Sequence, residues 1–163
     1  MSEIIRIKPH HFIDILTSFG EGQRRFEPHP YGHAVHTVSE RILADPDVLL
    51  EMELGADDIC RPCSHNVGGL CDDVIDTSYR PAAPRSKRES NILLDRRWCV
   101  RLGLAQGDQL TARQFARRTR DLAGDITDIY LEIPRARTAV RAANLAKGID
   151  FILEGNQEKN AAR

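Results

Sequence analysis

The stretch IIRIKPHHFIDILTSF, residues 4–19, predicts a short strand followed directly by a helix. Isoleucines dominate residues 4–7, as in a strand, and Pro9 suits a first helical turn because no intrahelical bond needs its amide. The apolar residues that follow recur at helical spacing, at Phe12, Ile13, Leu16 and Phe19. Gly20 and Gly22 then end the helix. The stretch therefore indicates a domain that mixes strands and helices.

The rest of the chain continues this mixed pattern, with more helix than strand. We expect helices over 31–43, 92–104, 111–123 and 134–148, the last one closed by Gly148, and a half-buried strand over 48–54. Residues 149–153 fit a final strand or a helix remnant, and residues 55–84 form a long loop without periodicity. The predicted fold is α+β: a mostly helical single domain over residues 1–155, with a short sheet, a cysteine-rich metal-binding loop and a frayed tail at 156–163.

Composition excludes several classes of function. The chain has 163 residues, 41% of them hydrophobic and 29% charged, with a formal net charge of -1. Such a balance lacks the positive field with which proteins coat nucleic acid, so we expect no nucleic-acid partner. No apolar run approaches the ~18 residues of a membrane span, and the opening residues do not resemble a secretory leader. We therefore expect a cytoplasmic protein with no membrane partner, whose four cysteines are reduced.

Those four cysteines carry the strongest chemical signal in the sequence. Cys60 and Cys63 form a C-x-x-C turn, which brings two thiolates to one metal centre. Cys71 follows a Gly-Gly turn that folds it back toward the pair, and Cys99 would arrive from the next helix as the fourth ligand. Cys99 also shares a helical stripe with apolar residues, so a buried core cysteine is the alternative for this residue.

The spacing favours an iron-sulfur cluster over zinc. Zinc sites built from four cysteines normally use two tight pairs, whereas this chain has one. A cubane [4Fe-4S] cluster presents separated iron corners and tolerates three ligands from one loop with a distant fourth. We therefore predict a [4Fe-4S] cluster, with zinc as the alternative cofactor.

Histidines at the start of the first helix suggest a polar wall beside this centre. His10 and His11 lie three to four residues before Asp14, so all three side chains can share one helix face. Such a group can act as general acid and base or complete a metal site, and it can equally serve only to stabilise the start of the helix. His65 lies between Cys63 and Cys71, close to any bound metal.

The chain contains two motifs, Lys8-Pro9-His10-His11-Phe12-Ile13 and the loop Asp57-Asp58-Ile59-Cys60-Arg61-Pro62-Cys63 with Gly69-Leu70-Cys71. Together they resemble an uncharacterised bacterial family of small iron-sulfur-type proteins. The segment Asp95 to Leu104 is similar to a helix of that family. The resemblance implies a cluster-binding protein. In this chain Asp14 stands where the family has a cysteine after its His-His motif, Cys99 falls on a position that is usually apolar, and residues 110–163 contain no cysteine.

These observations lead to a functional hypothesis with one open point. Cys60, Cys63 and Cys71 hold the cluster, and Cys99, Asp14, a histidine or a substrate fills the last position. An open iron would give Lewis-acid chemistry on a small polar substrate, such as dehydration, hydrolysis or desulfuration, with His10, His11 and Asp14 as candidate catalytic residues. A closed cluster would serve electron transfer or redox sensing with a redox partner. The alternative is a structural zinc module that binds a partner or regulates it.

Overall fold

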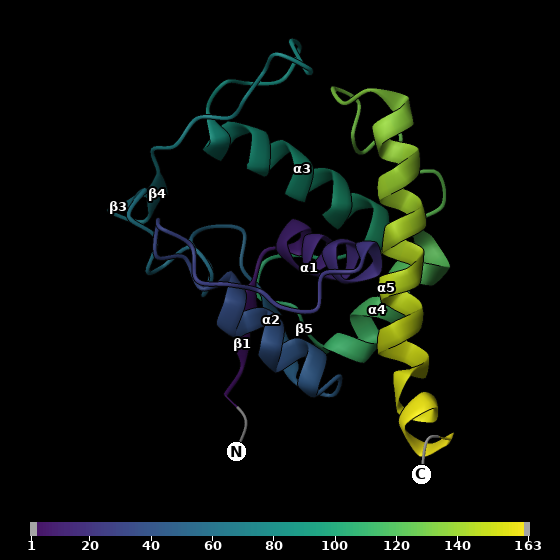
Figure 1. Ribbon diagram of the computed structural model, residues 1–163. Coiled ribbons are helices and arrows are strands. Elements are labelled where there is room, and N and C mark those ends of the chain that lie inside the picture. The colour runs from purple at the N-terminus through teal and green to yellow at the C-terminus, as the bar shows by residue number, and fades with distance from the viewer. Residues whose placement is uncertain (1–2, 162–163) are drawn as a thin grey trace.

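A computed structural model describes residues 3–161 of the chain, and the side chains of residues 3–155. It confirms the expected α+β class (Figure 1). The elements are β1 (Ile5–Ile7), α1 (Pro9–Glu21), α2 (Val35–Ala44), β2 (Leu49–Met52), β3 (Asn66–Val67), β4 (Leu70–Cys71), α3 (Lys87–Leu102), β5 (Gln109–Thr111), α4 (Ala112–Leu122) and α5 (Arg135–Ala161). None of the helices described is both long and apolar enough to cross a membrane.

A three-stranded mixed sheet anchors the N-terminal half of the fold. β1 runs parallel to β2, with Ile5 opposite Leu50, and β2 runs antiparallel to β5, with Leu50 opposite Leu110. These three side chains and their apolar neighbours belong to the core, because alternate residues of a strand face the same side of a sheet. The predicted strands at 4–7 and 48–54 are thus confirmed, whereas β5 was not predicted because it is short and largely polar.

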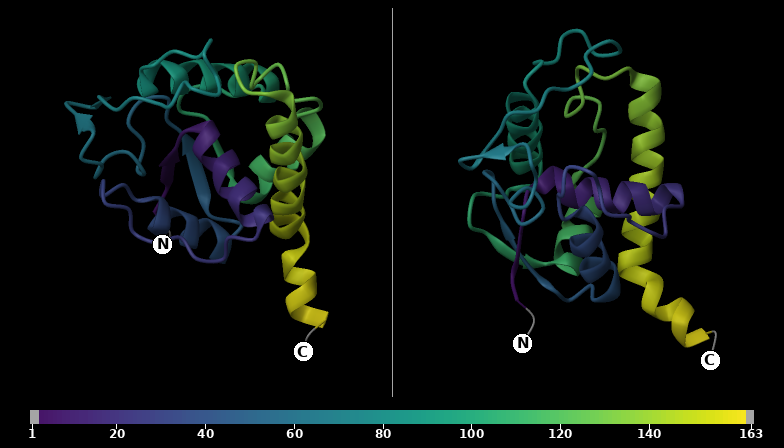
Figure 2. Two further views of the ribbon diagram at one scale, coloured as in Figure 1. Left: turned by 45° about the horizontal axis from the view of Figure 1, so that its top comes forward. Right: turned by 60° about the vertical axis from the view of Figure 1, so that its left-hand side comes forward.

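Helix α1 lies at the centre of the fold and crosses α5 closely, as the views in Figures 1 and 2 show. It begins at Pro9 and ends at Gly22, whose φ of 118° is a left-handed cap that glycine adopts without strain. A Cβ on Gly20 would lie 1.8 Å from the carbonyl oxygen of Asn144, and a Cβ on Gly148 would lie 1.9 Å from that of Leu16. The two glycines therefore allow the backbones of α1 and α5 to touch.

This crossing corrects the predicted end of the last helix. Gly148 does not close α5, which continues to Ala161, so residues 149–153 are helical rather than a strand. Glycine is tolerated inside this helix because a close backbone approach needs it there. Residues 162–163 of the predicted tail lie outside the described residues.

Other predicted helices exist with shifted starts. α2 begins at Val35 rather than 31, and α3 begins at Lys87 rather than 92. The start of α3 is fixed by Ser86, whose side chain accepts a hydrogen bond from the amide of Glu89. α4 begins after Thr111, as predicted, with a capping box completed by Gln114.

The hairpin of β3 and β4, within the cysteine loop of residues 55–84, lies on the side of the molecule opposite α5 in all three views (Figures 1 and 2). The only regular structure in this loop is the hairpin of β3 and β4, which has two residues in each strand. A bridge between Val74 and Ser86 closes the base of the loop. Within residues 55–84, Ile59 is the one hydrophobic side chain buried in the core. Hydrophobic burial therefore contributes little to the order of this loop.

Candidate metal centre

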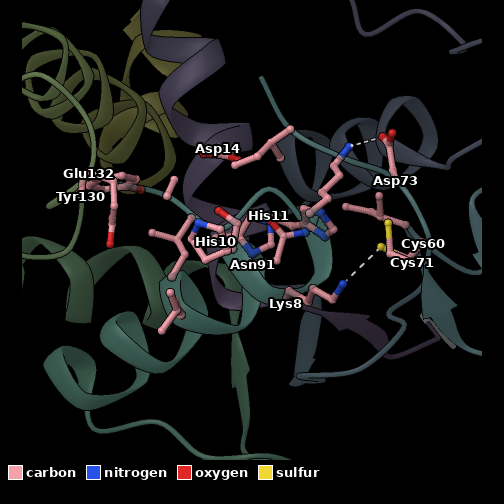
Figure 3. Close-up of a pocket in the computed structure, with 18 of the residues that line it drawn as sticks. Lys8, His10, His11, Asp14, Cys60, Cys71, Asp73, Asn91, Tyr130 and Glu132 are labelled. Atoms are coloured by element: carbon pink, nitrogen blue, oxygen red, sulfur yellow. Dashed lines mark hydrogen bonds and ion pairs between the residues drawn. The ribbon is translucent and has the colours of Figure 1, made fainter. Parts of the chain in front are cut away.

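A cavity of about 360 Å³, lined by charged and apolar side chains, opens between the start of α1, the cysteine loop, α3 and the segment before α5. Six of the seven predicted site residues line it: His10, His11, Asp14, Cys60, Cys63 and Cys71. Figure 3 shows Cys60 and Cys71 at one end of this cavity and Tyr130 and Glu132 at the other, with the two histidines between them. Its size suits a small molecule.

A second, smaller cavity of about 110 Å³ lies against the same three cysteines. Cys60, Cys63 and Cys71 line both cavities and so form part of the wall between them. Apolar side chains such as Leu54 and Ile92 contribute to the smaller cavity. The three thiols therefore border two cavities, of which the smaller is the more apolar.

Local backbone geometry explains how the loop presents its thiols. The amide of Cys63 donates to the carbonyl of Cys60 at 3.0 Å, which closes the C-x-x-C turn. The hairpin then turns at Gly68 and Gly69, whose φ angles of 61° and 87° favour glycine, and pairs Cys71 with Asn66. All three thiols are free. The sequence prediction that Cys71 folds back toward the pair is consistent with this geometry.

Asp57 connects the cysteine loop to the start of α1. It is fully buried, and its Oδ2 accepts hydrogen bonds from the amide of Lys8 at 2.8 Å and from Nδ1 of His11 at 2.7 Å. Its Oδ1 accepts from the amide of Cys60 at 2.9 Å. Burial opposes ionisation, but the charge and hydrogen bond of His11 and the Lys8 amide hold the pKa of Asp57 well below its usual range. An ionised Asp57 therefore holds the backbone of Lys8, the ring of His11 and the backbone of Cys60 in place together.

One compact group of potential metal ligands stands out among the described residues. A ring nitrogen of His11, a carboxylate oxygen of Asp57 and the sulfur of Cys60 all lie within 4.8 Å of one another. Nitrogen, oxygen and sulfur donors at such distances suit a first-row metal ion.

His10 has a carboxylate partner of its own. Its Nδ1 lies 2.8 Å from Oδ1 of Asp95, its amide donates to the same oxygen at 2.9 Å, and both side chains are buried. Burial would lower the pKa of His10, but the charge of Asp95 and its hydrogen bond raise it above the ordinary value. The rings of His10 and His11 lie 4.3 Å apart, so the cavity wall carries two adjacent histidines, each oriented by an aspartate.

The aspartates that pair with the two histidines, Asp57 and Asp95, are not the one that helical spacing suggested, which was Asp14. Asp14 lines the cavity as predicted, but its carboxylate accepts a hydrogen bond from Arg141 at 2.9 Å and pairs with neither histidine. Sequence reasoning missed Asp57 and Asp95 as partners because they lie 46 and 85 residues from the histidines they bind. The available signal was the position of Asp57 three residues before Cys60, which is typical of a side chain that accepts from a turn amide.

Lys8 lies next to Cys60. The residue is only 7% exposed, and its Nζ lies 3.4 Å from the sulfur of Cys60 (Figure 3). Burial and the charge of Asp57 raise the pKa of Cys60 to about 11, although Lys8 acts in the opposite direction. Ionisation of this thiol at neutral pH therefore requires a further positive charge, such as a bound metal.

The structure does not bring Cys99 to the other cysteines. Its side chain is buried in the hydrophobic core with residues such as Trp98 and Leu102, and it lines neither cavity. Burial raises the pKa of this thiol to about 11. The expected fourth ligand therefore occupies the position that its apolar helical stripe favours.

Charged pairs complete the wall of the larger cavity. Arg97 forms two hydrogen bonds to Glu132, at 2.9 and 2.8 Å, and Lys87 pairs with Asp73 at 3.2 Å. His65, beside the hairpin, pairs with Asp72 at 2.7 Å.

Comparison of the chain with protein-family models, with curated proteins and with solved structures finds no match.

Proposed function

We propose that this protein binds one iron-sulfur cluster, of the [4Fe-4S] type, through Cys60, Cys63 and Cys71. One observation carries the proposal: three free thiols from a single loop line the same two cavities, in a loop with a single hydrophobic residue in the core. A segment of this kind gains its order from something other than apolar burial, and metal coordination supplies such order.

The spacing of the thiols supports a cluster over a single ion. Zinc-sulfur bonds of about 2.3 Å place the sulfurs of a tetrahedral site about 3.8 Å apart. In the part of the chain that is described, the compact ligand group includes Cys60 but neither Cys63 nor Cys71. The corners of a cubane cluster accept thiolates that lie farther apart.

The adjoining cavity supports a role on a small polar substrate. A cluster iron with an exchangeable ligand supplies Lewis-acid chemistry, of the kind used in dehydration, hydrolysis and desulfuration. The cavity wall that includes His10, His11 and Asp14 would orient a substrate, and His10 and Asp14 would exchange protons with it. The paired charges at the far end of the cavity, Arg97 with Glu132, would favour polar over apolar molecules.

A single zinc ion is the second candidate, and one observation favours it. Ligand atoms of His11 and Cys60 belong to a compact group whose members lie within 4.8 Å of one another, close to the separation that one ion spans. The protein would then be a zinc-stapled interaction or regulatory module, since a closed zinc site stabilises a loop without redox chemistry.

Anaerobic purification followed by metal analysis tests the proposal. We expect a brown protein with broad visible absorbance and about four iron and four acid-labile sulfide per chain. Substitution of serine for Cys60, Cys63 or Cys71 should abolish the absorbance, while Cys99→Ser should retain it. A colourless wild-type protein with one zinc and no sulfide would overturn the cluster and leave the zinc module.

A further inference from the structure

We infer that His11 supplies, through Nε2, the fourth protein ligand of the metal centre held by the loop cysteines, with Asp57 as the residue that orients its ring. The inference rests on the proposed function only in so far as Cys60, Cys63 and Cys71 hold a metal. It applies to an iron-sulfur cluster and to zinc alike.

The hydrogen bonds of Asp57 exclude it as a ligand, although it belongs to the compact group. Oδ2 already accepts two hydrogen bonds and Oδ1 accepts one, from groups on both sides of the site. The residue is fully buried, with no exposed surface directed toward either cavity. Coordination by Asp57 would break bonds that hold the loop to α1, so its role is to position other groups.

The same hydrogen bonds leave one ring nitrogen of His11 for a metal. Nδ1 of His11 is engaged at 2.7 Å by the Asp57 carboxylate, which fixes the tautomer with the proton on Nδ1. Nε2 is then the ring nitrogen left for a metal, on a side chain that is 17% exposed and lines the cavity together with the cysteines. A histidine that donates its second nitrogen to a carboxylate is the usual arrangement of a metal-bound imidazole.

The other candidates for the fourth position are less well placed. Cys99 lies in the core, and Asp14 is held by Arg141. His10 and His65 line the cavity with carboxylate-bound rings, but within the described residues neither joins a compact group with a loop cysteine. Among the described residues, His11 is the histidine whose ring joins Cys60 in such a group, and since its Nδ1 is bound to Asp57, Nε2 is the nitrogen that remains for a metal.

A histidine in this position has a chemical consequence. Imidazole is a neutral ligand whereas thiolates are negatively charged, so a histidine ligand would raise the reduction potential of a cluster above that of one held by thiolates alone. His11 lines the larger cavity. The histidine-bound corner of the centre would therefore border this cavity.

Pulsed electron paramagnetic resonance of the reduced protein labelled with ¹⁵N-histidine tests the inference directly. We expect a nitrogen hyperfine coupling in the wild type that disappears in His11→Cys, a variant in which a thiolate replaces the imidazole and the cluster persists. His65→Ala is the matched control, because it removes another cavity histidine with a carboxylate-bound ring, and it should retain the coupling. If the metal is zinc, X-ray absorption should show three sulfur and one nitrogen ligands, changing to four sulfurs in His11→Cys.

The outcomes separate this inference from the proposed function. A wild-type protein without metal refutes the proposed function. A metal-loaded wild type that lacks the nitrogen signal, or a His11→Cys variant that keeps it, overturns the role of His11 alone. Because the wild-type spectrum is itself decisive, instability of a variant does not prevent the test.

Discussion

Nδ1 of His11 donates a 2.7 Å hydrogen bond to Oδ2 of Asp57, a fully buried carboxylate that lies 46 residues farther along the chain. This bond joins the first turn of α1 to the loop that carries the cysteines. Since the same carboxylate accepts from the amides of Lys8 and Cys60, any change at Asp57 acts on the helix start and on the loop together.

Asp57→Asn should weaken metal binding more than it weakens the fold elsewhere. The amide cannot accept all three hydrogen bonds with the strength of a carboxylate, and loss of a residue that orients a ligand typically costs 10–100-fold in metal affinity. We also expect a loss of about 3 kcal/mol of stability, because buried donors are left with weaker partners. Competition with a chelator and urea unfolding measure the two effects.

Asp72→Asn is the control for this prediction. Asp72 makes the same kind of bond to His65, at 2.7 Å, but its side chain is 57% exposed. Water replaces lost hydrogen bonds at such a position, so metal affinity and stability should change little. Equal effects of the two substitutions would contradict the special role of Asp57.

The buried pair of His10 and Asp95 should make the metal-free protein less stable at alkaline pH. The pKa of His10 is raised in the folded state, because Asp95 outweighs the effect of burial. Its contribution is fully present below the unfolded pKa of about 6.5 and is lost as pH rises through the higher folded value. The free energy of unfolding should therefore fall as the pH rises from about 6 through the folded pKa of His10, as urea titrations would measure.

Asp95→Asn should remove this pH dependence, because the neutral amide no longer favours the charged imidazole. The variant should be less stable than the wild type at pH 6, and the difference should shrink at higher pH. If the free energy of unfolding of the wild type rose with pH over this range, the predicted direction of the pH dependence would be wrong.

Gly148→Ala should destabilise the crossing of α1 and α5. The added Cβ would lie 1.9 Å from the backbone oxygen of Leu16, and a backbone atom cannot move aside as a side chain can. Overpacking of this kind costs about 3 kcal/mol. Thermal unfolding measures the loss.

Gly155→Ala offers a matched comparison in the same helix. Its Cβ would approach only the ring of Phe151, at 3.3 Å, which can adjust. The substitution should be neutral or stabilise the protein by up to about 1 kcal/mol through helix propensity. If both substitutions behaved alike, close helix contact would not be the reason for glycine at 148.

Cys99→Ala should leave metal content unchanged and lower stability by about 1 kcal/mol, since it removes one buried atom from a packed core. Iron and zinc analysis beside calorimetry would measure both. Loss of the metal in this variant would instead show that Cys99 is a metal ligand.

The sequence predicts what neighbouring residues determine and misses what distant residues determine. Residues 4–19 contain the signals of their own strand and helix, and Thr111 contains the cap of α4, so both were found. Gly148 looks like a helix end unless the approach of Leu16 is known. Cys60, Cys63 and Cys71 are close in sequence and were found together, whereas the aspartate partners of the histidines come from separate segments. Asp14 shares a helix face with His10, but Arg141, 127 residues away, binds it instead.

The close crossing of α1 and α5 also sets an order for biosynthesis. Every ligand we assign lies before residue 72, so the ribosome delivers the complete set early. Yet α1, which carries His11, packs against α5, which is translated well after these ligands, with backbone contacts at Gly20 and Gly148. The histidine therefore takes its final position only after α5 has been synthesised, so loading of the centre follows synthesis of its ligands by at least 60 residues.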